Sequence, residues 1–278
     1  MSGEHLPRVP HGQGPPAARA RGSAHEPRPE RARFLRRDNR FVAHVERADG
    51  DRVRAYVPNT GRLDDLLLED AEVMVEPARD PRRRTRWTLT RVWDGTWVAL
   101  DALAPGRLVA EALRTGTPLP GWPRPLDVRP EVTLGHHRFD LAVDLADGRT
   151  GIVEVKSLTS ARDGTAPLSS TPSARGVAHL EELAALARRG DPAAAVFVVQ
   201  RGDVEVLDLT APAAATWTDA VRRARRDGVL VAAYACEVDE ARLRLGRALV
   251  VRDQRHGPGQ TRSVPERDQA TSATTSPT

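Results

Sequence analysis

The sequence predicts an α+β protein with an N-terminal OB-like β-barrel, a C-terminal α/β domain and disordered termini. Three observations predict this organisation. Short alternating segments, separated by turn residues, fill the first part of the folded chain, and strand and helix patterns alternate in the second part. Both ends of the 278-residue chain are rich in Pro, Gly, Ser or charged residues. Because such segments bury too little apolar surface to fold, we expect residues 1–33 and 253–278 to be disordered.

The barrel is expected over residues 34–101. Its candidate strands follow the period of two that half-buried strands require, and they are Phe41–Val45, Val53–Val57, Ala71–Pro77, Thr85–Trp93 and Thr96–Leu100. The residues ADGD separate the first two strands as a hairpin loop. A turn at PNTG follows, because Asn59 and Gly61 tolerate positive φ. Several short strands with this turn punctuation favour a small closed barrel.

The second domain is expected over residues 102–252. Its predicted elements, in chain order, are a helix at Gly106–Thr115, strands at Glu131–Gly135, Arg138–Leu145 and Gly151–Lys156, a helix at Ser173–Arg189, a strand at Ala193–Gln200, a helix at Thr216–Asp227 and a strand at Val229–Ala235. A Pro-rich loop precedes the first strand, and Ala146-Asp147-Gly148 makes a tight turn between the second and third. This succession predicts helices layered on a sheet.

Composition limits the classes of function. The formal net charge of +4 and the sequence pI of about 10.1 permit a polyanionic partner without demanding one. Cys236 is the only cysteine, which excludes an intramolecular disulfide framework and a cysteine-based zinc site and fits a reducing, cytoplasmic location. No apolar run is as long as a membrane span, and the N-terminus lacks the apolar segment of a signal peptide. The arginine-rich N-terminal segment is either a polyanion contact or, as we favour, a solvated tail.

Lys156 is the only lysine among the 42 lysine and arginine residues, and it lies in the stretch GIVEVKSLTS. Alternation along a strand places Glu154 and Lys156 on one face, and a hairpin through the preceding turn pairs Asp140 with one of them. Carboxylates are the hard ligands that Mg²⁺ or Mn²⁺ prefers, and a compact ammonium can orient a water or neutralise developing charge better than a guanidinium. The alternative is an ordinary surface ion pair worth under about 1 kcal/mol.

Arginines crowd a loop between two predicted barrel strands, at Arg82, Arg83, Arg84 and Arg86. Such loops carry the ligand in OB-like barrels, and arginine beside an aromatic residue suits phosphate contact and base stacking. The alternative is a solvated basic loop with Trp87 in the barrel core.

Three further residues are candidates for phosphate contact. Arg62 directly follows the predicted PNTG turn. Arg175 and His179 lie one helical turn apart near the start of a predicted helix, where amide donors favour an anion. A core or capping role for His179 is the alternative.

Six motifs follow one another along the chain: PNTGRL at 58–63, RRRTRW at 82–87, GRLVAEAL at 106–113, HRFDLAV at 137–143, IVEVKSLT at 152–159 and ARGVAHLEEL at 174–183. With these motifs the chain resembles the sugar fermentation stimulation protein A (SfsA) family. The resemblance implies an N-terminal OB-like domain, a C-terminal domain like the PD-(D/E)xK nucleases, and largely sequence-independent DNA binding. It also implies that Asp140 and Glu154 are metal ligands, that Lys156 is catalytic, and that Glu111 occupies a further acidic position of the metal site.

The residues and the resemblance together predict a nucleic-acid-binding protein with a metal-dependent phosphodiester hydrolase site. DNA or RNA is the expected partner, and Mg²⁺ or Mn²⁺ the expected cofactor. One alternative is a non-catalytic DNA-binding regulator of sugar-utilisation genes that retains the nuclease-like fold. Another is an enzyme that acts on a small phosphorylated ligand. The stretch 168–171 lacks two carboxylates that the family often carries before Arg175, and this departure concerns catalysis more than fold.

Overall fold

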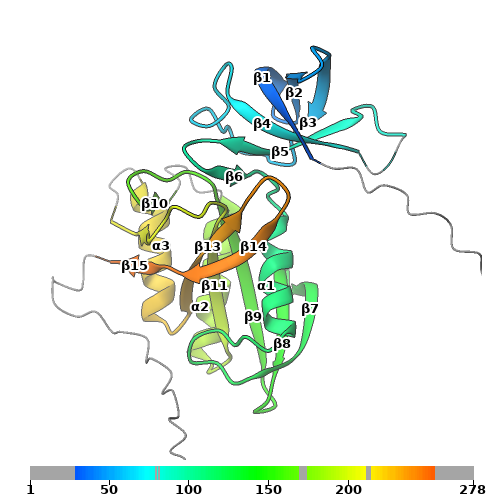
Figure 1. Cartoon of the computed structure of the whole chain (residues 1–278). Coiled ribbons are helices and arrows are strands. Elements are labelled where there is room, and N and C mark those ends of the chain that lie inside the picture. The colour runs from blue at the N-terminus through cyan, green and yellow to red at the C-terminus, as the bar shows by residue number, and fades with distance from the viewer. Residues whose placement is uncertain (1–28, 79, 81, 169–173, 211–213, 254–278) are drawn as a thin grey trace, which may run out of the picture.

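The computed structural model describes residues 29–78, 80, 82–168, 174–210 and 214–253. The predicted disordered tails lie outside the described residues except at 29–33 and 253. Figure 1 shows a small β domain placed against one end of a larger domain that contains helices and a sheet. The predicted α+β architecture, with a barrel followed by an α/β domain, is confirmed.

The N-terminal domain is a closed β-barrel. Its strands are β1 (Glu30–Asn39), β2 (Val42–Arg47), β3 (Arg52–Tyr56), β4 (Glu72–Pro77), β5 (Trp87–Trp93) and the short β6 (Trp97–Ala99). Within the described residues they pair in the order β3-β2-β1-β4-β5-β6, and a parallel pairing of β3 with β5 closes the barrel. Ala43, Val45 and Ala55 point inward and are fully buried. The alternation that predicted these strands therefore also forms the barrel core.

The barrel begins earlier in the chain than expected. β1 starts at Glu30, so the predicted boundary between a disordered tail and the barrel at residue 33 is wrong. In the first half of β1 only Ala32 and Phe34 are buried, and the other residues are charged. Outward arginines meet acids of neighbouring strands, as where Arg33 Nη2 lies 2.7 Å from Glu46 Oε1. Such a strand has the composition of a tail, because half of its positions face solvent.

The C-terminal domain is built on a mixed β-sheet. Its strands are β7 (Pro125–Leu134), β8 (His137–Leu145), β9 (Thr150–Leu158), β11 (Ala193–Val199), β13 (Leu230–Val238) and β14 (Leu243–Ala248). In the described part of the chain their order is β14-β13-β11-β9-β8-β7. β9, β11 and β13 are parallel to one another, and β14, β8 and β7 pair antiparallel. The short strands β10 (Thr165–Pro167), β12 (Val206–Asp208) and β15 (Val250–Arg252) form a separate parallel sheet.

Strand β7 is longer than expected, because it takes in part of the predicted Pro-rich loop. It begins at Pro125 and includes Pro130. β7 is the edge strand of the sheet, and proline is tolerated at an edge because its missing N–H need not join the ladder on the open side.

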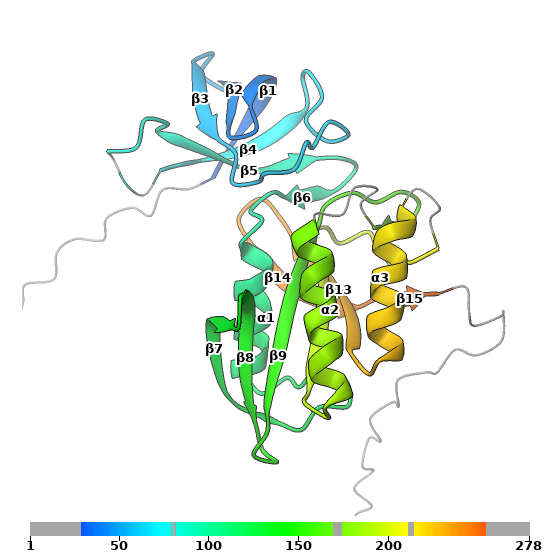
Figure 2. The same cartoon turned by 180° about the vertical axis from the view of Figure 1, so that it is seen from behind.

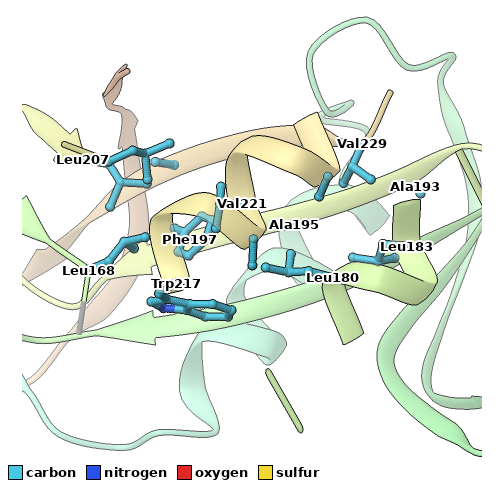
Figure 3. Close-up of a cluster of buried hydrophobic side chains, with 14 of the residues drawn as sticks. Leu168, Leu180, Leu183, Ala193, Ala195, Phe197, Leu207, Trp217, Val221 and Val229 are labelled. Carbon is cyan, nitrogen blue, oxygen red and sulfur yellow. The ribbon is translucent and has the colours of Figure 1, made fainter. Parts of the chain in front are cut away.

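Helices cover both faces of this sheet. They are α1 (Ala104–Arg114), α2 (Ala174–Arg188) and α3 (Ala215–Arg226). α1 lies on one face, and α2 and α3 lie together on the other (Figures 1 and 2). Val109 of α1 packs in one core with Val153, whereas Leu180 of α2 and Trp217 of α3 pack in a second core with Phe197 (Figure 3). Among the described residues, no helix is both long and apolar enough to cross a membrane.

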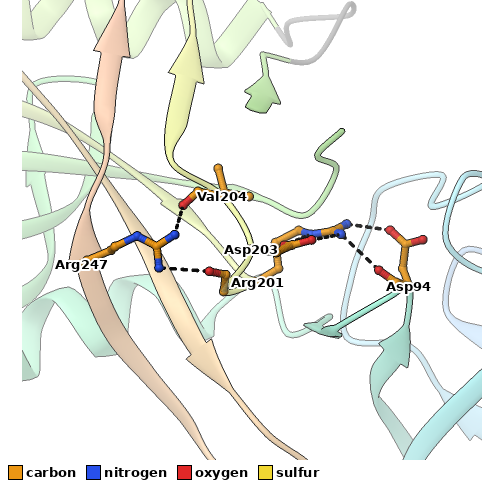
Figure 4. Close-up of polar contacts among 6 residues, drawn as sticks. Asp94, Arg201, Asp203, Val204 and Arg247 are labelled. Carbon is orange, nitrogen blue, oxygen red and sulfur yellow. Dashed lines mark hydrogen bonds and ion pairs between the residues drawn. The ribbon is translucent and has the colours of Figure 1, made fainter. Parts of the chain in front are cut away.

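A buried arginine joins the two domains. Arg201 follows β11 and is 4% exposed. Its Nη1 lies 2.7 Å from Oδ2 of Asp94, in the barrel turn between β5 and β6, and its Nε lies 2.7 Å from Oδ1 of Asp203 (Figure 4). The backbone N–H of Ala99 also donates to the carbonyl of Gln200 at 2.9 Å. These contacts fix the barrel to the end of the central strand β11.

Candidate functional site

Asp140, Glu154 and Lys156 converge at the point where two neighbouring strands separate. β8 and β9 pair antiparallel with Leu141 opposite Val153, and their ladder ends there. Asp140 and Glu154 are the next positions of the same register, so they lie on the same side of the sheet, and Lys156 follows on that side. This register is one of the two that the predicted hairpin allowed.

The side chain of Asp140 takes the place of a ladder bond. Its Oδ2 accepts a hydrogen bond from the backbone N–H of Val155 at 2.6 Å. Val153 and Val155 pack in the core under α1, so Glu154 and Lys156 face the opposite side, which α2 and α3 cover. The carboxylates and the ammonium therefore sit between the splayed strands and helix α2.

Glu154 is held rigidly, and one of its oxygens has no donor. The residue is 5% exposed. Its Oε1 lies 2.5 Å from Lys156 Nζ and 2.7 Å from Nδ1 of His179. Its Oε2 is buried and has no hydrogen-bond partner among the described residues. A buried carboxylate oxygen without a donor needs an explanation, and a bound cation supplies one.

The electrostatics around Asp140 also fit a cation. Burial raises the pKa of the Asp140 carboxyl above its usual value, and the negative charge of Glu154 raises it further. The Val155 N–H and the charge of Lys156 oppose that rise. A divalent ion between the two carboxylates would offset the negative charge that raises the pKa of Asp140. Asp140 is half-buried and the Lys156 side chain is 21% exposed, so the cluster is open to solvent.

His179 is buried and hydrogen-bonds to Glu154, so its ring does not lie at the surface. It comes from α2, is 3% exposed, and its ring lies 5.2 Å from that of Phe139 between centroids. With the proton on Nδ1, the imidazole donates to Glu154 while its Nε2 accepts from Nε of Arg175 at 3.4 Å. The placement favours the core-histidine alternative for His179, since a buried ring is not open to a nucleic-acid strand. Arg175 is exposed at the open edge of the same group.

The structure does not bring Glu111 into this cluster. Glu111 is exposed on α1, whereas Val109, Ala110 and Leu113 of that helix are buried against the sheet. Among the described residues, no three His, Cys, Asp or Glu side chains are grouped so that they could hold a metal ion. The donor set in view is therefore the carboxylate pair of Asp140 and Glu154.

The arginines of the β4–β5 loop take different positions. Arg82 pairs with Asp80 at 3.1 Å, and the guanidinium of Arg83 lies over the ring of Tyr56, 4.7 Å from its centroid. Arg84 and Arg86 are exposed, and no ion pair involves either of them within the described part of the chain. The loop therefore presents two free guanidinium groups to solvent.

Two further residues that the sequence analysis weighed, Arg62 and Trp87, lie elsewhere on the barrel. Arg62 is exposed and pairs with Asp64 at 2.8 Å. Trp87 is half-buried against the barrel core with the guanidinium of Arg47 over its ring, which agrees with the alternative that placed Trp87 in the core. A role for Trp217 was not predicted: its ring centroid lies 5.9 Å from Lys156 Nζ, and no local sequence signal pairs a helix residue with this strand.

Comparison with known proteins matches both domains. A family model described as the SfsA N-terminal OB domain matches residues 35–100, and one described as the sugar fermentation stimulation protein RE domain matches residues 103–242. A sugar fermentation stimulation protein homolog of Acetivibrio thermocellus is 38% identical over 217 residues, which are 77% of this chain and 92% of the relative. One of Chloroflexus aurantiacus is 38% identical over 224 residues, 79% of this chain and 84% of the relative.

A solved structure matches the fold of both domains together. It is that of Pyrococcus furiosus SfsA in complex with Ca²⁺, with a TM-score of 0.71 and 26% sequence identity. The match covers 81% of this chain and 96% of that protein.

Proposed function

The chain belongs to the sugar fermentation stimulation protein family, and from that premise we propose that it binds nucleic acid and hydrolyses phosphodiester bonds in a divalent-metal-dependent reaction. The single observation that carries this proposal is the buried Oε2 of Glu154, which has no donor among the described residues and belongs to a carboxylate whose charge acts on Asp140. A lysine shares the same face of the strand. The two carboxylates, with one oxygen free of donors, could bind a metal ion. The neighbouring ammonium could offset the negative charge that develops during metal-assisted hydrolysis.

Asp140 and Glu154 would hold Mg²⁺ or Mn²⁺, which when bound supplies stabilisation of the negative charge that develops on the phosphoryl oxygens. The description of the Pyrococcus relative as a Ca²⁺ complex supports a divalent ion, since Ca²⁺ also takes oxygen ligands. Two protein carboxylates are enough for Mg²⁺, which usually binds one or two carboxylates and keeps several waters.

Lys156 orients the attacking water and offsets negative charge at the phosphate. Its ammonium is anchored on Glu154, yet the side chain is 21% exposed and keeps donors for a second partner. A bond forms between the water oxygen and phosphorus, and the water gives up a proton. The bond from phosphorus to the leaving sugar oxygen breaks, and that oxygen takes up a proton. His179 keeps Glu154 in place, and Arg175 at the open edge contacts an adjacent phosphate.

Exposed arginines of the barrel hold the nucleic-acid backbone. Arg84 and Arg86 are free of ion pairs within the described residues, and Arg62 is exposed beside a single aspartate. Contacts from arginine to phosphate position a strand without reading its bases, so the binding is largely independent of sequence.

A second function has its own support. Glu111 lies outside the cluster, and the stretch 168–171, which is only partly within the described residues, lacks the acids that the family often carries. A site with two carboxylates and no further acid also suits a DNA-binding regulator that has kept the nuclease-like fold without turnover.

The decisive experiment measures cleavage and binding in the same preparations. Purified wild-type protein is incubated with plasmid DNA and with single-stranded DNA or RNA, in Mg²⁺, in Mn²⁺ and in EDTA. We expect cleavage only with a divalent ion, and a loss of about 10²- to 10⁴-fold in rate for Lys156→Ala. Arg226→Ala, which removes an exposed cation from α3, is the matched control and should cleave like the wild type. Retained binding without cleavage in any metal would favour the regulator.

A further inference from the structure

We propose that the barrel carries a base-stacking platform for unpaired nucleic acid, formed by the ring of Phe41, the ring of Tyr56 and the guanidinium of Arg83. This inference rests on the proposed function and narrows its substrate to strands with exposed bases.

Two nearly parallel aromatic rings lie at the barrel surface, one of them exposed and the other half-buried. Phe41 lies between β1 and β2 and is 44% exposed, and Tyr56 ends β3. Their centroids are 6.5 Å apart and their planes differ by 13°. The Phe41 carbonyl accepts the N–H of Val57 at 2.9 Å, and Val42 pairs with Tyr56 in the ladder. The strand pairing therefore holds the Phe41 ring at the surface, where a base can reach it.

The guanidinium of Arg83 lies over the ring of Tyr56 and adds a planar cation to the aromatic pair. Its Cζ lies 4.7 Å from the centroid of Tyr56, and its Nη1 donates to Oγ1 of Thr88 at 3.3 Å. Bases stack on aromatic rings and on guanidinium planes alike. The platform thus joins the β1–β2 connection, the end of β3 and the β4–β5 loop, all of which lie on one side of the barrel.

Charge at the margin of the platform selects the kind of partner. Arg40, Arg84 and Arg86 are exposed, and within the described residues none of them takes part in an ion pair. An apolar protein surface would leave these guanidinium groups without partners, whereas a phosphate backbone supplies them. Charge complementarity therefore favours nucleic acid as the occupant.

Stacking further selects an unpaired strand. In a duplex both faces of each base are covered by neighbouring bases, so an aromatic ring of the protein has no base face to meet. Arginine contacts to phosphate accept duplex and single strand alike. An exposed ring pair contributes only where bases are unstacked, as in single strands, flaps or loops.

The chain segment that follows Tyr56 contacts the domain that carries the candidate active site. Pro58 follows Val57 and its carbonyl accepts the N–H of Ala102 at 2.9 Å, at the junction of the domains. Farther along, Oδ2 of Asp65 accepts from Oγ of Ser160 at 2.6 Å. Ser160 comes four residues after Lys156, a span of at most about 13 Å at roughly 3.3 Å per residue. These contacts join the segment that follows Tyr56 to the domain that carries Lys156.

The test is a binding measurement in EDTA, so that cleavage does not interfere. The probes are fluorescein-labelled oligo-dT of about 15 nucleotides, the matching oligo-U, and a duplex, all followed by anisotropy. The proteins are the wild type, Phe41→Ala, Phe41→Leu and Phe41→Trp, and the matched control is Leu126→Ala, which truncates an exposed apolar side chain on β7. Circular dichroism melts establish that each variant is folded.

We expect Phe41→Ala to weaken single-strand binding by about 5- to 100-fold and duplex binding by less than about 2-fold. Phe41→Leu should bind nearly as weakly as Phe41→Ala because it lacks a π-face, and Phe41→Trp should bind like the wild type. The salt dependence should not change, because no phosphate contact is lost. A loss with oligo-dT alone or with oligo-U alone also supports the platform and identifies which of these two nucleic acids it takes.

The outcomes separate this inference from the proposed function. If the wild type binds single strands and Phe41→Ala binds them equally well, the platform is refuted and the nucleic-acid function stands. The platform is also refuted if Phe41→Leu binds like the wild type, because then apolar contact alone is at work. If the wild type binds none of the three probes, both proposals fail.

Discussion

Replacing His179 by leucine should weaken divalent-ion binding although it removes none of the predicted ligands. The imidazole and the Glu154 carboxylate are both buried, and His179 Nδ1 lies 2.7 Å from Oε1. The other donor to that oxygen is Lys156, at 2.5 Å. A hydrogen bond to a charged group is worth about 1.5–3 kcal/mol, so the metal-free protein should lose about that much free energy of unfolding. Loss of a partner that orients a metal ligand typically costs about 10- to 100-fold in metal affinity.

Isothermal titration with Mn²⁺ measures the affinity, and urea denaturation without metal measures the stability. His179→Asn retains a side-chain N–H near the position of Nδ1 and should recover most of the affinity. His136→Leu, at an exposed histidine in the turn before β8, is the matched control and should bind Mn²⁺ like the wild type. The reasoning is refuted if folded His179→Leu binds Mn²⁺ within about twofold of the wild type.

Further predictions concern stability. The raised pKa of Asp140 means that its contribution to metal-free stability is present below the ordinary aspartate pKa and is lost as pH rises through the raised value. Asp140→Asn should therefore raise the Tm at pH 7 without metal and abolish the rise in Tm on adding Mn²⁺; a lower metal-free Tm would contradict this. Gly151→Ala should cost about 1–3 kcal/mol in urea unfolding, because a Cβ there would lie 2.4 Å from the Trp122 ring. Gly106→Ala, in open space on α1, should instead stabilise by about 0.5–1 kcal/mol, and equal effects at the two glycines would refute the steric argument.

The sequence predicted most of the fold because most elements show their burial as a local pattern. The uniformly buried β11 and the amphipathic α2 are of this kind. β1 and β14 escaped prediction, since both are polar or half-exposed strands whose partners lie elsewhere in the chain. The Pro-containing start of β7 was taken for a loop, because its place at a sheet edge is a property of the topology and not of the local sequence.

The candidate site was predictable only where it depends on one hairpin. The turn at 146–148 fixes the register that brings Asp140 to Glu154, and strand alternation then places Lys156. The placement of His179 and Glu111 depends on how two helices pack on opposite faces of the sheet. Glu111 lies between two alanines, so the sequence alone does not say which side of α1 faces the core. The Phe41–Tyr56 pair likewise arises from pairing between strands.

The buried Arg201 has a consequence for movement between the two domains. Its guanidinium lies between Asp94 of the barrel and Asp203 of its own domain, so a hinge opening between the domains would break the hydrogen bonds to Asp94. The contact between the domains therefore keeps the distance between the barrel surface and Lys156 nearly constant. If both proposals hold, a strand bound on the barrel would be cut at a fixed number of nucleotides from the platform, whatever its sequence.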